Sequence, residues 1–255
     1  MLLFCSEDDV KELLSIPALV IAGSRSAREV MLTLGRSRNV EVCYGTIDPT
    51  RIKLNPERTK SIRESLGLSD KTYVWTMAGT LDPNKNPVRF VHIAAEMLKE
   101  NWDVHFMWLG GHETGYSFYA RELAARLGVA EKVSWVGARS EDYYDYLNAT
   151  DGFLLTSSKE SFSIVSVEAA FLGKPIVAFD CGGIREIVLE GMGVVVDSWN
   201  HSDLIRQMLS IMKQEILFDP RISREKIRDF FIDTQGEHWL SVIQKHFPPG
   251  NNSHI

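Results

Sequence analysis

The feature that most limits how this chain can fold is a regular alternation of short apolar segments with longer amphipathic ones, from Tyr73 to Met212. Strands that are apolar on both faces and alternate with helices are typical of a parallel sheet covered on both sides. We therefore predict an α/β fold with a doubly wound, Rossmann-like parallel sheet. The predicted strands are residues 73–78, 104–109, 133–136, 152–155, 175–179 and 194–196.

Helix signals fill the segments between these strands. The clearest begins at Asn86, a good N-cap, followed by Pro87 at the first turn and by apolar residues at helical spacing. Ligands bind doubly wound sheets outside the carboxyl ends of the strands, so the turns after the strands are the first place to look for a site. Other helices are predicted at 118–127, 141–147 and 204–212, near 162–164, and after Gly182-Gly183.

Smaller elements flank this region. A strand at 17–22, a helix at 26–35 and a strand at 39–44 form a β-α-β unit that is too small for a sheet of its own. Near the other end, residues 224–244 are predicted to form a terminal helix interrupted at 233–236. We divide the chain into segments 1–47, 48–215, a helical segment 216–246 that packs back toward the N-terminal part, and a mobile tail 247–255.

Composition argues against several function classes. The 255 residues carry a net charge of −6, whereas nucleic-acid-binding domains usually present a basic stripe. Cys5, Cys43 and Cys181 are too few and too widely spaced for a disulfide framework or a zinc site. Acidic residues at 7–9 argue against a signal peptide, and no apolar run approaches the ~20 residues of a membrane span. We expect a cytoplasmic protein with no nucleic-acid partner, and composition leaves a peripheral membrane association open.

One stretch, residues 159–188, combines an anion-binding helix start with two carboxylates. Glu160 and Glu168 bracket the start of the predicted helix, whose first N–H groups attract anions such as phosphate. An ionised carboxylate only accepts hydrogen bonds, which suits the hydroxyls of ribose or a hexose. Phosphate donors beside hydroxyl acceptors predict a nucleotide-sugar site. The competing interpretation is that the serines at 161, 163 and 166 only cap and solvate the helix.

Two more loops fall at the same predicted edge of the sheet. Gly79 allows close approach of a ligand and Lys85 can reach a diphosphate; alternatively, Lys85 is a surface lysine after a proline turn. Gly182 and Gly183 either let backbone amides approach a sugar or phosphate, or form a plain turn with Glu186 at a helix start.

Rival nucleotide-binding motifs are absent or incomplete. No G-x-G-x-x-G follows the strand at 73–78 or the one at 104–109. The run G-G-H-E-T-G-Y-S has the glycine spacing of a P-loop, but Tyr116 stands where the phosphate-binding lysine is required. The sequence therefore argues against a phosphate-transferring ATPase.

Several of these motifs together resemble the donor-binding half of a retaining GT-B glycosyltransferase of family 4. E-S-F-S-I at 160–164 with E-A-A at 168–170 is similar to the E-x7-E motif of that family. G-K-P-I-V at 173–177, G-G-I-R-E-I-V at 182–188 and Y-G-T-I-D at 44–48 match neighbouring family segments. The resemblance implies that 48–215 is the nucleotide-sugar-binding domain and that 1–47 is a remnant of the acceptor-side domain.

The resemblance also implies roles for individual residues. Lys85 would neutralise the donor diphosphate, Glu160 would bind hydroxyls of the transferred sugar, and Glu168 would bind the ribose. Backbone amides around Phe162, Ser163 and Ile164 would bind sugar and phosphate, Val136 and its neighbours the base, and Gly79 and Thr80 would lie against the donor. The donor would be a UDP- or GDP-sugar, with no other cofactor and no metal.

The chain departs from the family pattern in three places. Thr80 stands where an arginine is usual, and Ser161 and Ser163 replace glycines. Most of the acceptor-side domain, with its donor-contacting histidine, has no counterpart in residues 1–45. We expect either a hexosyltransferase acting on a glycan or lipid-linked acceptor with retention, as in polysaccharide biosynthesis, or a truncated or split chain. The second would bind nucleotide-sugar but need a separate acceptor-binding chain for activity.

Overall fold

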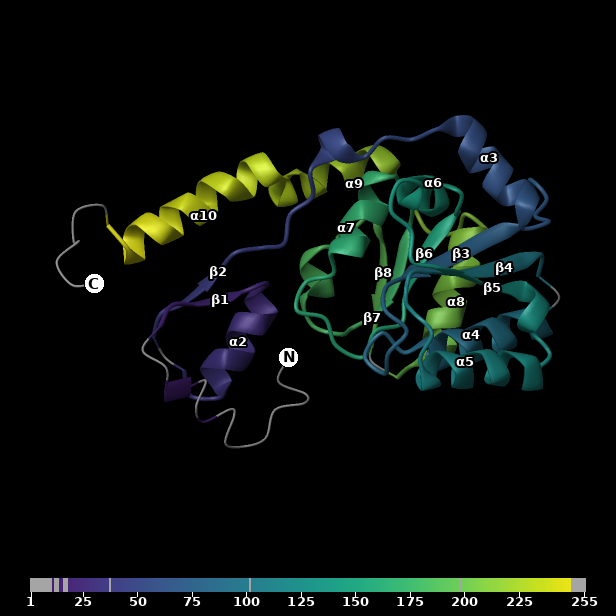
Figure 1. The fold of residues 1–255 in the computed structure, drawn as a ribbon, viewed down its shortest axis with the longest axis horizontal. Coiled ribbons are helices and arrows are strands. Elements are labelled where there is room, and N and C mark those ends of the chain that lie inside the picture. Colours follow the sequence, from purple (N-terminus) through teal and green to yellow (C-terminus); the bar gives the residue numbers. More distant parts are fainter. Residues whose placement is uncertain are drawn as a thin grey trace.

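Six parallel strands form the main sheet of the protein in a computed structural model (Figure 1). The spatial order is β5-β4-β3-β6-β7-β8, and every neighbouring pair is parallel. The predicted α/β fold with a doubly wound parallel sheet is thereby confirmed. The strands are β3 (Tyr73–Ala78), β4 (Val104–Leu109), β5 (Val133–Gly137), β6 (Gly152–Leu155), β7 (Ile176–Phe179) and β8 (Gly193–Val196).

The structure describes residues 11, 14–15, 18–36, 38–100, 102–197 and 199–248. Cys5 and the other residues of 1–10, which belong to the predicted segment 1–47, lie outside the described residues. So do residues 249–255 of the predicted tail.

The strand order reverses direction between β3 and β6. From β3 the chain moves outward to β4 and β5, then crosses back to place β6 on the other side of β3. Consequently the loops that follow β3 and β6 leave the sheet side by side at its carboxyl edge. This switch point is where open α/β sheets bind ligands.

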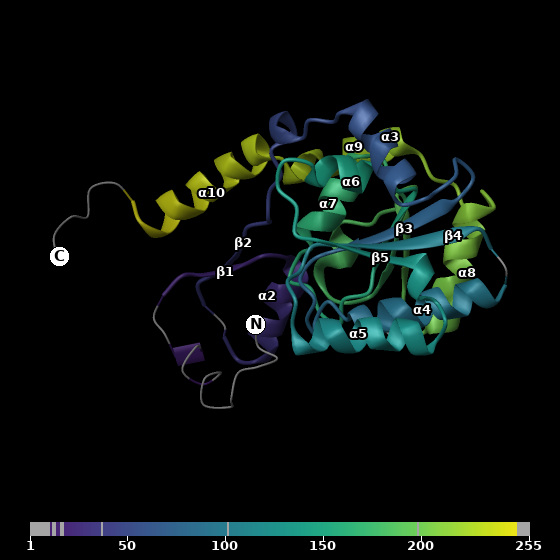
Figure 2. The same ribbon diagram turned by 45° about the vertical axis from the view of Figure 1, so that its right-hand side comes forward.

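Helices cover both faces of the sheet (Figures 1 and 2). On one face α4 contacts α5 and α8, while on the other α3 contacts α6, and α7 contacts α9. Among the described residues, no helix combines the length and apolar character needed to cross a membrane. The bounds are α3 (Pro56–Ser65), α4 (Pro87–Lys99), α5 (Gly115–Arg126), α6 (Tyr143–Asn148), α7 (Ile164–Phe171), α8 (His201–Met212) and α9 (Pro220–Lys226).

The core lies against the central strands. All six residues of β4 are buried, and Phe90 of α4 packs edge-on against Phe106 and Trp108 of that strand. Burying one such side chain contributes about 1.5–3 kcal/mol. The central strands are thus a rigid base for the loops at their carboxyl ends.

A smaller unit stands beside the main sheet. Strands β1 (Val20–Ala22) and β2 (Val40–Val42) pair in parallel, and helix α2 (Arg25–Thr33) connects them. The last helix, α10 (Ile232–His246), extends from the main sheet to this unit (Figures 1 and 2), where Lys245 and His246 contact Glu41 at 2.6 and 2.9 Å. The division of the chain into four segments stays a prediction.

Two helix predictions were wrong. The helix expected over 224–244 is broken after α9 by a 3₁₀ turn (Ile227–Phe230), whereas residues 233–236 are helical. The break arises because Ile47 N–H donates to the Phe230 carbonyl, and Ile232 N–H donates to the Ile47 carbonyl, which draws Phe231 into an extended conformation. After Gly182 the chain forms a single 3₁₀ turn (Gly183–Glu186) in place of the expected helix.

Candidate active site

The loops that follow β3 and β6 bring Lys85 and Glu160 together. Lys85 Nζ lies 2.5 Å from Glu160 Oε1, and the Ser157 hydroxyl donates to the same oxygen at 2.7 Å. The lysine side chain is 21% exposed and the glutamate side chain 8%. Among the described residues no protein group donates to Glu160 Oε2, which leaves that oxygen for a ligand.

The loop carrying Lys85 is shaped by a tight turn. Asp82 Oδ1 accepts hydrogen bonds from the backbone N–H groups of Asn84 and Lys85 at 2.8 and 2.9 Å, and Thr80 donates its hydroxyl to Asp82 Oδ2 at 2.5 Å. Gly79 has φ +151°, and a Cβ there would touch the methylene carbons of Lys85 at 3.4 Å. A Cβ at this distance would make an ordinary van der Waals contact, so the backbone conformation of Gly79, and not a lack of room, favours glycine here.

The loop carrying Glu160 rests on the turn after β7. Glu160 N–H donates to the Cys181 carbonyl at 2.6 Å, and Gly183 N–H donates to the Glu160 carbonyl at 3.2 Å. A Cβ on Gly182 would lie 2.4 Å from the Glu160 carbonyl oxygen, and one on Gly183 would lie 2.4 Å from that of Ser161. The absence of side chains at these two glycines lets the two loops pack closely. The approach of their backbone amides to a sugar or phosphate stays a prediction.

Helix α7 begins beside this ion pair. Ser163 at its N-cap is left-handed, with φ +88° and ψ +73°, and its hydroxyl is 2.8 Å from that of Ser166. The N–H groups of Ile164 and Val165 donate to no protein group among the described residues. Together with Lys85 and Glu160, this helix start lines a cavity of about 570 Å³. Its opposite wall comes from the N-terminal unit and α10 through Ile21, Gly23, Cys43, Tyr44, Gly45 and Trp239.

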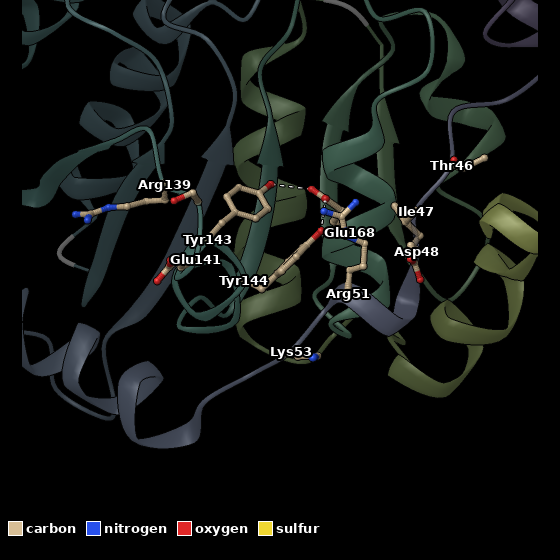
Figure 3. A pocket seen from close by; sticks show the side chains of 11 residues that line it. Thr46, Ile47, Asp48, Arg51, Lys53, Arg139, Glu141, Tyr143, Tyr144 and Glu168 are labelled. Atoms are coloured by element: carbon tan, nitrogen blue, oxygen red, sulfur yellow. Dashed lines mark hydrogen bonds between the residues drawn. The ribbon is translucent and has the colours of Figure 1, made fainter.

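Glu168 lies one turn further along α7 and faces a second cavity, of about 640 Å³ (Figure 3). Tyr143 and Tyr144 of α6 donate their hydroxyls to its carboxylate at 2.8 and 2.9 Å. Burial raises the pKa of Glu168, and the two tyrosine hydrogen bonds oppose that rise. Burial, followed by the nearby Glu168 charge, raises the pKa of Tyr144 to about 12, so its hydroxyl stays a donor at neutral pH.

The predicted site residues thus fall into two groups. Lys85, Glu160 and residues 162–164 share the first cavity, and Glu168 lines the second. Gly79 and Thr80 shape the Lys85 turn, and the half-buried Val136 lies on β5. These last three do not line either cavity, and the roles assigned to all of these residues stay predictions. Within the described part of the chain, no three His, Cys, Asp or Glu side chains gather closely enough to hold a metal ion.

Sequence reasoning missed three tyrosines. Tyr143 and Tyr144 follow β5 at the carboxyl edge of the sheet, but within a predicted helix they were indistinguishable from apolar packing residues. Tyr44 donates its hydroxyl to Glu186 at 2.7 Å, and Glu186 also accepts the N–H groups of Arg25 and Ser26 at the start of α2. Glu186 therefore satisfies the first N–H groups of a helix that lies about 160 positions earlier in the chain. No local sequence pattern predicts such a contact.

A six-stranded parallel sheet with two loops meeting at its switch point is the Rossmann-like fold found in GT-B glycosyltransferases, and the match to a glycosyltransferase family model assigns the chain to that class. The chain belongs to the family described as glycosyl transferases group 1, whose model matches residues 58–229. This is a family of transferase enzymes.

Several similar curated proteins share one name. The D-inositol 3-phosphate glycosyltransferase of Rhodococcus jostii (strain RHA1) is 29% identical over 210 residues, which cover 75% of this chain and 46% of that protein. The protein of the same name from Rhodococcus erythropolis (strain PR4 / NBRC 100887) is 30% identical over 197 residues, covering 71% of this chain and 44% of the relative. The chain spans less than half the length of these relatives.

Solved structures show the same fold. Anabaena Alr3699/HepE in complex with UDP-glucose matches with a TM-score of 0.83 and 23% identity, over 96% of this chain and 70% of that chain. Sucrose-phosphate synthase from Thermosynechococcus elongatus matches with a TM-score of 0.79 and 18% identity, over 96% of this chain and 63% of that chain.

Proposed function

We propose that this chain binds a nucleotide-sugar donor and is the donor-binding half of a retaining, family 4 hexosyltransferase. The donor is a UDP- or GDP-sugar, and the acceptor is a glycan or a lipid-linked molecule. One observation carries the proposal: the Lys85–Glu160 pair stands at the switch point of the sheet, beside the free amides of α7. The HepE complex with UDP-glucose, similar in fold, supports a donor of this class.

In this proposal the first cavity holds the diphosphate and the transferred sugar. The diphosphate displaces Glu160 as the partner of Lys85 and also accepts the N–H groups of Ile164 and Val165. Glu160 keeps its bond from Ser157 and uses Oε2 to accept a sugar hydroxyl. As the glycosidic bond breaks, negative charge grows on the leaving diphosphate, and fixed donors aimed at that charge stabilise the transition state.

The second cavity receives the nucleoside in this proposal. Glu168 binds the ribose hydroxyls, and the base lies toward β5 and Val136. The chain segment that joins β2 to α3 contributes to both cavities: Tyr44 and Gly45 line the first, and Thr46, Ile47, Asp48 and Arg51 line the second.

Calorimetric titration of UDP and GDP tests the proposal. We expect the chain to bind one of them, and Lys85→Met to weaken that binding about tenfold or more, because one charge-assisted hydrogen bond of roughly 1.5–3 kcal/mol is lost. Lys99→Met is the matched control, since Lys99 lies exposed at the far end of α4 and, among the described residues, forms an ion pair with Glu96 alone. Absence of binding by either nucleotide at millimolar concentration contradicts the proposal.

The second candidate is a chain that binds donor but is inactive without a separate acceptor-binding chain. The observation behind it is that the chain matches only 46% of the length of the Rhodococcus jostii relative. Incubating the purified chain with UDP-glucose and mixed acceptors, followed by mass spectrometry, distinguishes an active transferase from a chain that is inactive without a partner. Glycosylated product or released sugar excludes the inactive alternative.

A further inference from the structure

Two consecutive tyrosines at the start of α6 reach the same carboxylate. Tyr143 donates its hydroxyl to Glu168 Oε2, and Tyr144 donates to Oε1, so each carboxylate oxygen has one tyrosine donor (Figure 3). The two rings pack edge to face, with centroids 5.0 Å apart and an interplanar angle of 72°. The rings therefore support each other as well as the carboxylate.

We propose that Tyr143 and Tyr144 are positioning residues that hold Glu168 ready for the 2′ and 3′ hydroxyls of a ribonucleoside diphosphate. They thereby make the site selective for ribose over deoxyribose. This inference rests on the proposed function, in which Glu168 binds the ribose of the donor.

The count of hydrogen-bond positions fits a vicinal diol. A carboxylate offers about four acceptor positions, two on each oxygen. The tyrosines occupy one position on each oxygen, which leaves one on each for a ligand. Two neighbouring acceptors on a planar group match the two neighbouring hydroxyls of a ribose, while a 2′-deoxyribose leaves one acceptor unused.

Fixing the carboxylate in advance strengthens binding. A free glutamate side chain loses rotamer freedom when it is immobilised by a ligand, and that loss subtracts from the affinity. Glu168 is 9% exposed and held at both oxygens, so it has already lost this freedom in the protein alone. Without the tyrosine hydroxyls, the ligand would have to order the side chain.

The hydroxyls also favour the ionised form of the acceptor. Burial raises the pKa of Glu168, and hydrogen bonds from Tyr143 and then Tyr144 lower it. A protonated carboxyl has fewer acceptor positions for the ribose. Other charged groups lining this cavity are Asp48, Arg51, Lys53, Arg139 and Glu141.

The test compares ribonucleotide and deoxyribonucleotide in variants that lack one hydroxyl. In wild type we expect UDP to bind about tenfold more tightly than 2′-deoxy-UDP, as for one hydrogen bond to a charged group. In Tyr143→Phe and in Tyr144→Phe we expect the ratio of the UDP affinity to the 2′-deoxy-UDP affinity to fall to about two- or threefold, because UDP loses more affinity than its deoxy form. If wild type prefers GDP, the pair is GDP and 2′-deoxy-GDP.

Two control variants distinguish a loss of Glu168 positioning from a general loss of folding or nucleotide affinity. Tyr146→Phe makes the same chemical change on the same helix, where the ring stacks on Arg139 and makes no hydrogen bond to Glu168; it should keep the wild-type ratio. Lys85→Met should weaken both nucleotides equally and keep the ratio, because Lys85 acts on the diphosphate. If Tyr143→Phe does not fold, Tyr144→Phe carries the test.

An unchanged ratio in the tyrosine variants overturns the inference. So does tighter UDP binding, since it would mean that the hydroxyls compete with the ribose. If wild type binds neither UDP nor GDP, the proposed function fails and the inference falls with it. Binding by wild type with an unchanged ratio in the variants overturns only the positioning role.

Discussion

Ser163 shows how a single residue can be strained where the site is built. It holds φ +88° at the N-cap of α7, in a region that costs a residue with a side chain about 1–2 kcal/mol relative to glycine. The Ser163–Ser166 hydroxyl contact offsets part of that cost. The position where the related family motif usually has glycine is thus one where this backbone favours glycine.

We predict that Ser163→Gly changes the free energy of unfolding by less than about 0.5 kcal/mol, because the strain relieved offsets both the hydrogen bond lost and the unfolded-state entropy that glycine adds. The free energy of unfolding in urea measures the change. Ser161→Gly is the matched control: Ser161 is not among the described residues with positive φ, so glycine there only adds unfolded-state entropy and destabilises. Equal destabilisation by both variants would show that Ser163 is not strained.

At the scale of elements, the pairing of β4 with β5 buries a titratable group. His105 on β4 is 5% exposed, and its Nε2 lies 2.8 Å from the Ser134 hydroxyl on β5. Burial, aided by the charges of Lys132 and Arg63, lowers the pKa of His105 to about 4. The folded protein therefore holds this imidazole neutral at a pH where the unfolded chain protonates it.

The sign of the pH dependence follows from that difference. Stability from a neutral His105 is fully present above the unfolded pKa near 6.5 and is lost as the pH falls toward about 4. Between pH 6.5 and 5 we predict a loss of about 1–2 kcal/mol in wild type, and a smaller loss in His105→Gln. Burial also lowers the pKa of His201, which leaves a residual slope of the same sign.

Urea unfolding at several pH values measures this slope. His112→Gln, at an exposed loop histidine, should behave as wild type does. A slope in His105→Gln as steep as in wild type would place the titrating group elsewhere.

At the scale of the whole molecule, the small N-terminal unit is held to the main sheet at a few polar points. Glu186 joins them by accepting from Tyr44 and from the first N–H groups of α2. Tyr44 also packs against Phe162 and Phe230, with ring centroids 5.4 and 5.2 Å away. The same contacts carry Tyr44 into the wall of the first cavity, so this junction sets the shape of the site.

We predict that Tyr44→Phe speeds hydrogen exchange of the α2 amides at Arg25 and Ser26, because Glu186 loses the donor that orients it. One hydrogen bond to a charged group contributes roughly 1.5–3 kcal/mol, which corresponds to at least about tenfold faster exchange if exchange occurs by local opening. Tyr73→Phe is the control, since that hydroxyl bonds the Asp151 carbonyl within the main domain and should leave α2 unchanged. Equal protection of α2 in both variants would show that the junction depends on packing alone.

Much of this architecture could be predicted from local sequence patterns. The six strands predicted for the main sheet lie within one residue of the observed ones, because short apolar runs between helices are typical of buried parallel strands. The strands predicted at 17–22 and 39–44 match β1 and β2 less closely. Lys85 and Glu160 could be placed at one edge of the sheet for the same reason, since parallel strands end together. The break between α9 and α10 could not be placed, because it depends on hydrogen bonds between Ile47 and residues almost two hundred positions later.

The sequence by itself determined the strands of the main sheet, their parallel arrangement and the loops that carry the candidate site. Only the tertiary structure decided that Glu168 is held by Tyr143 and Tyr144, and that Glu186 caps α2 instead of its own turn. The physical reason is the distance along the chain over which each kind of interaction acts. Hydrophobic periodicity and helix caps act between near neighbours in the chain, whereas the partner of a buried carboxylate is whichever donor the packing brings to it.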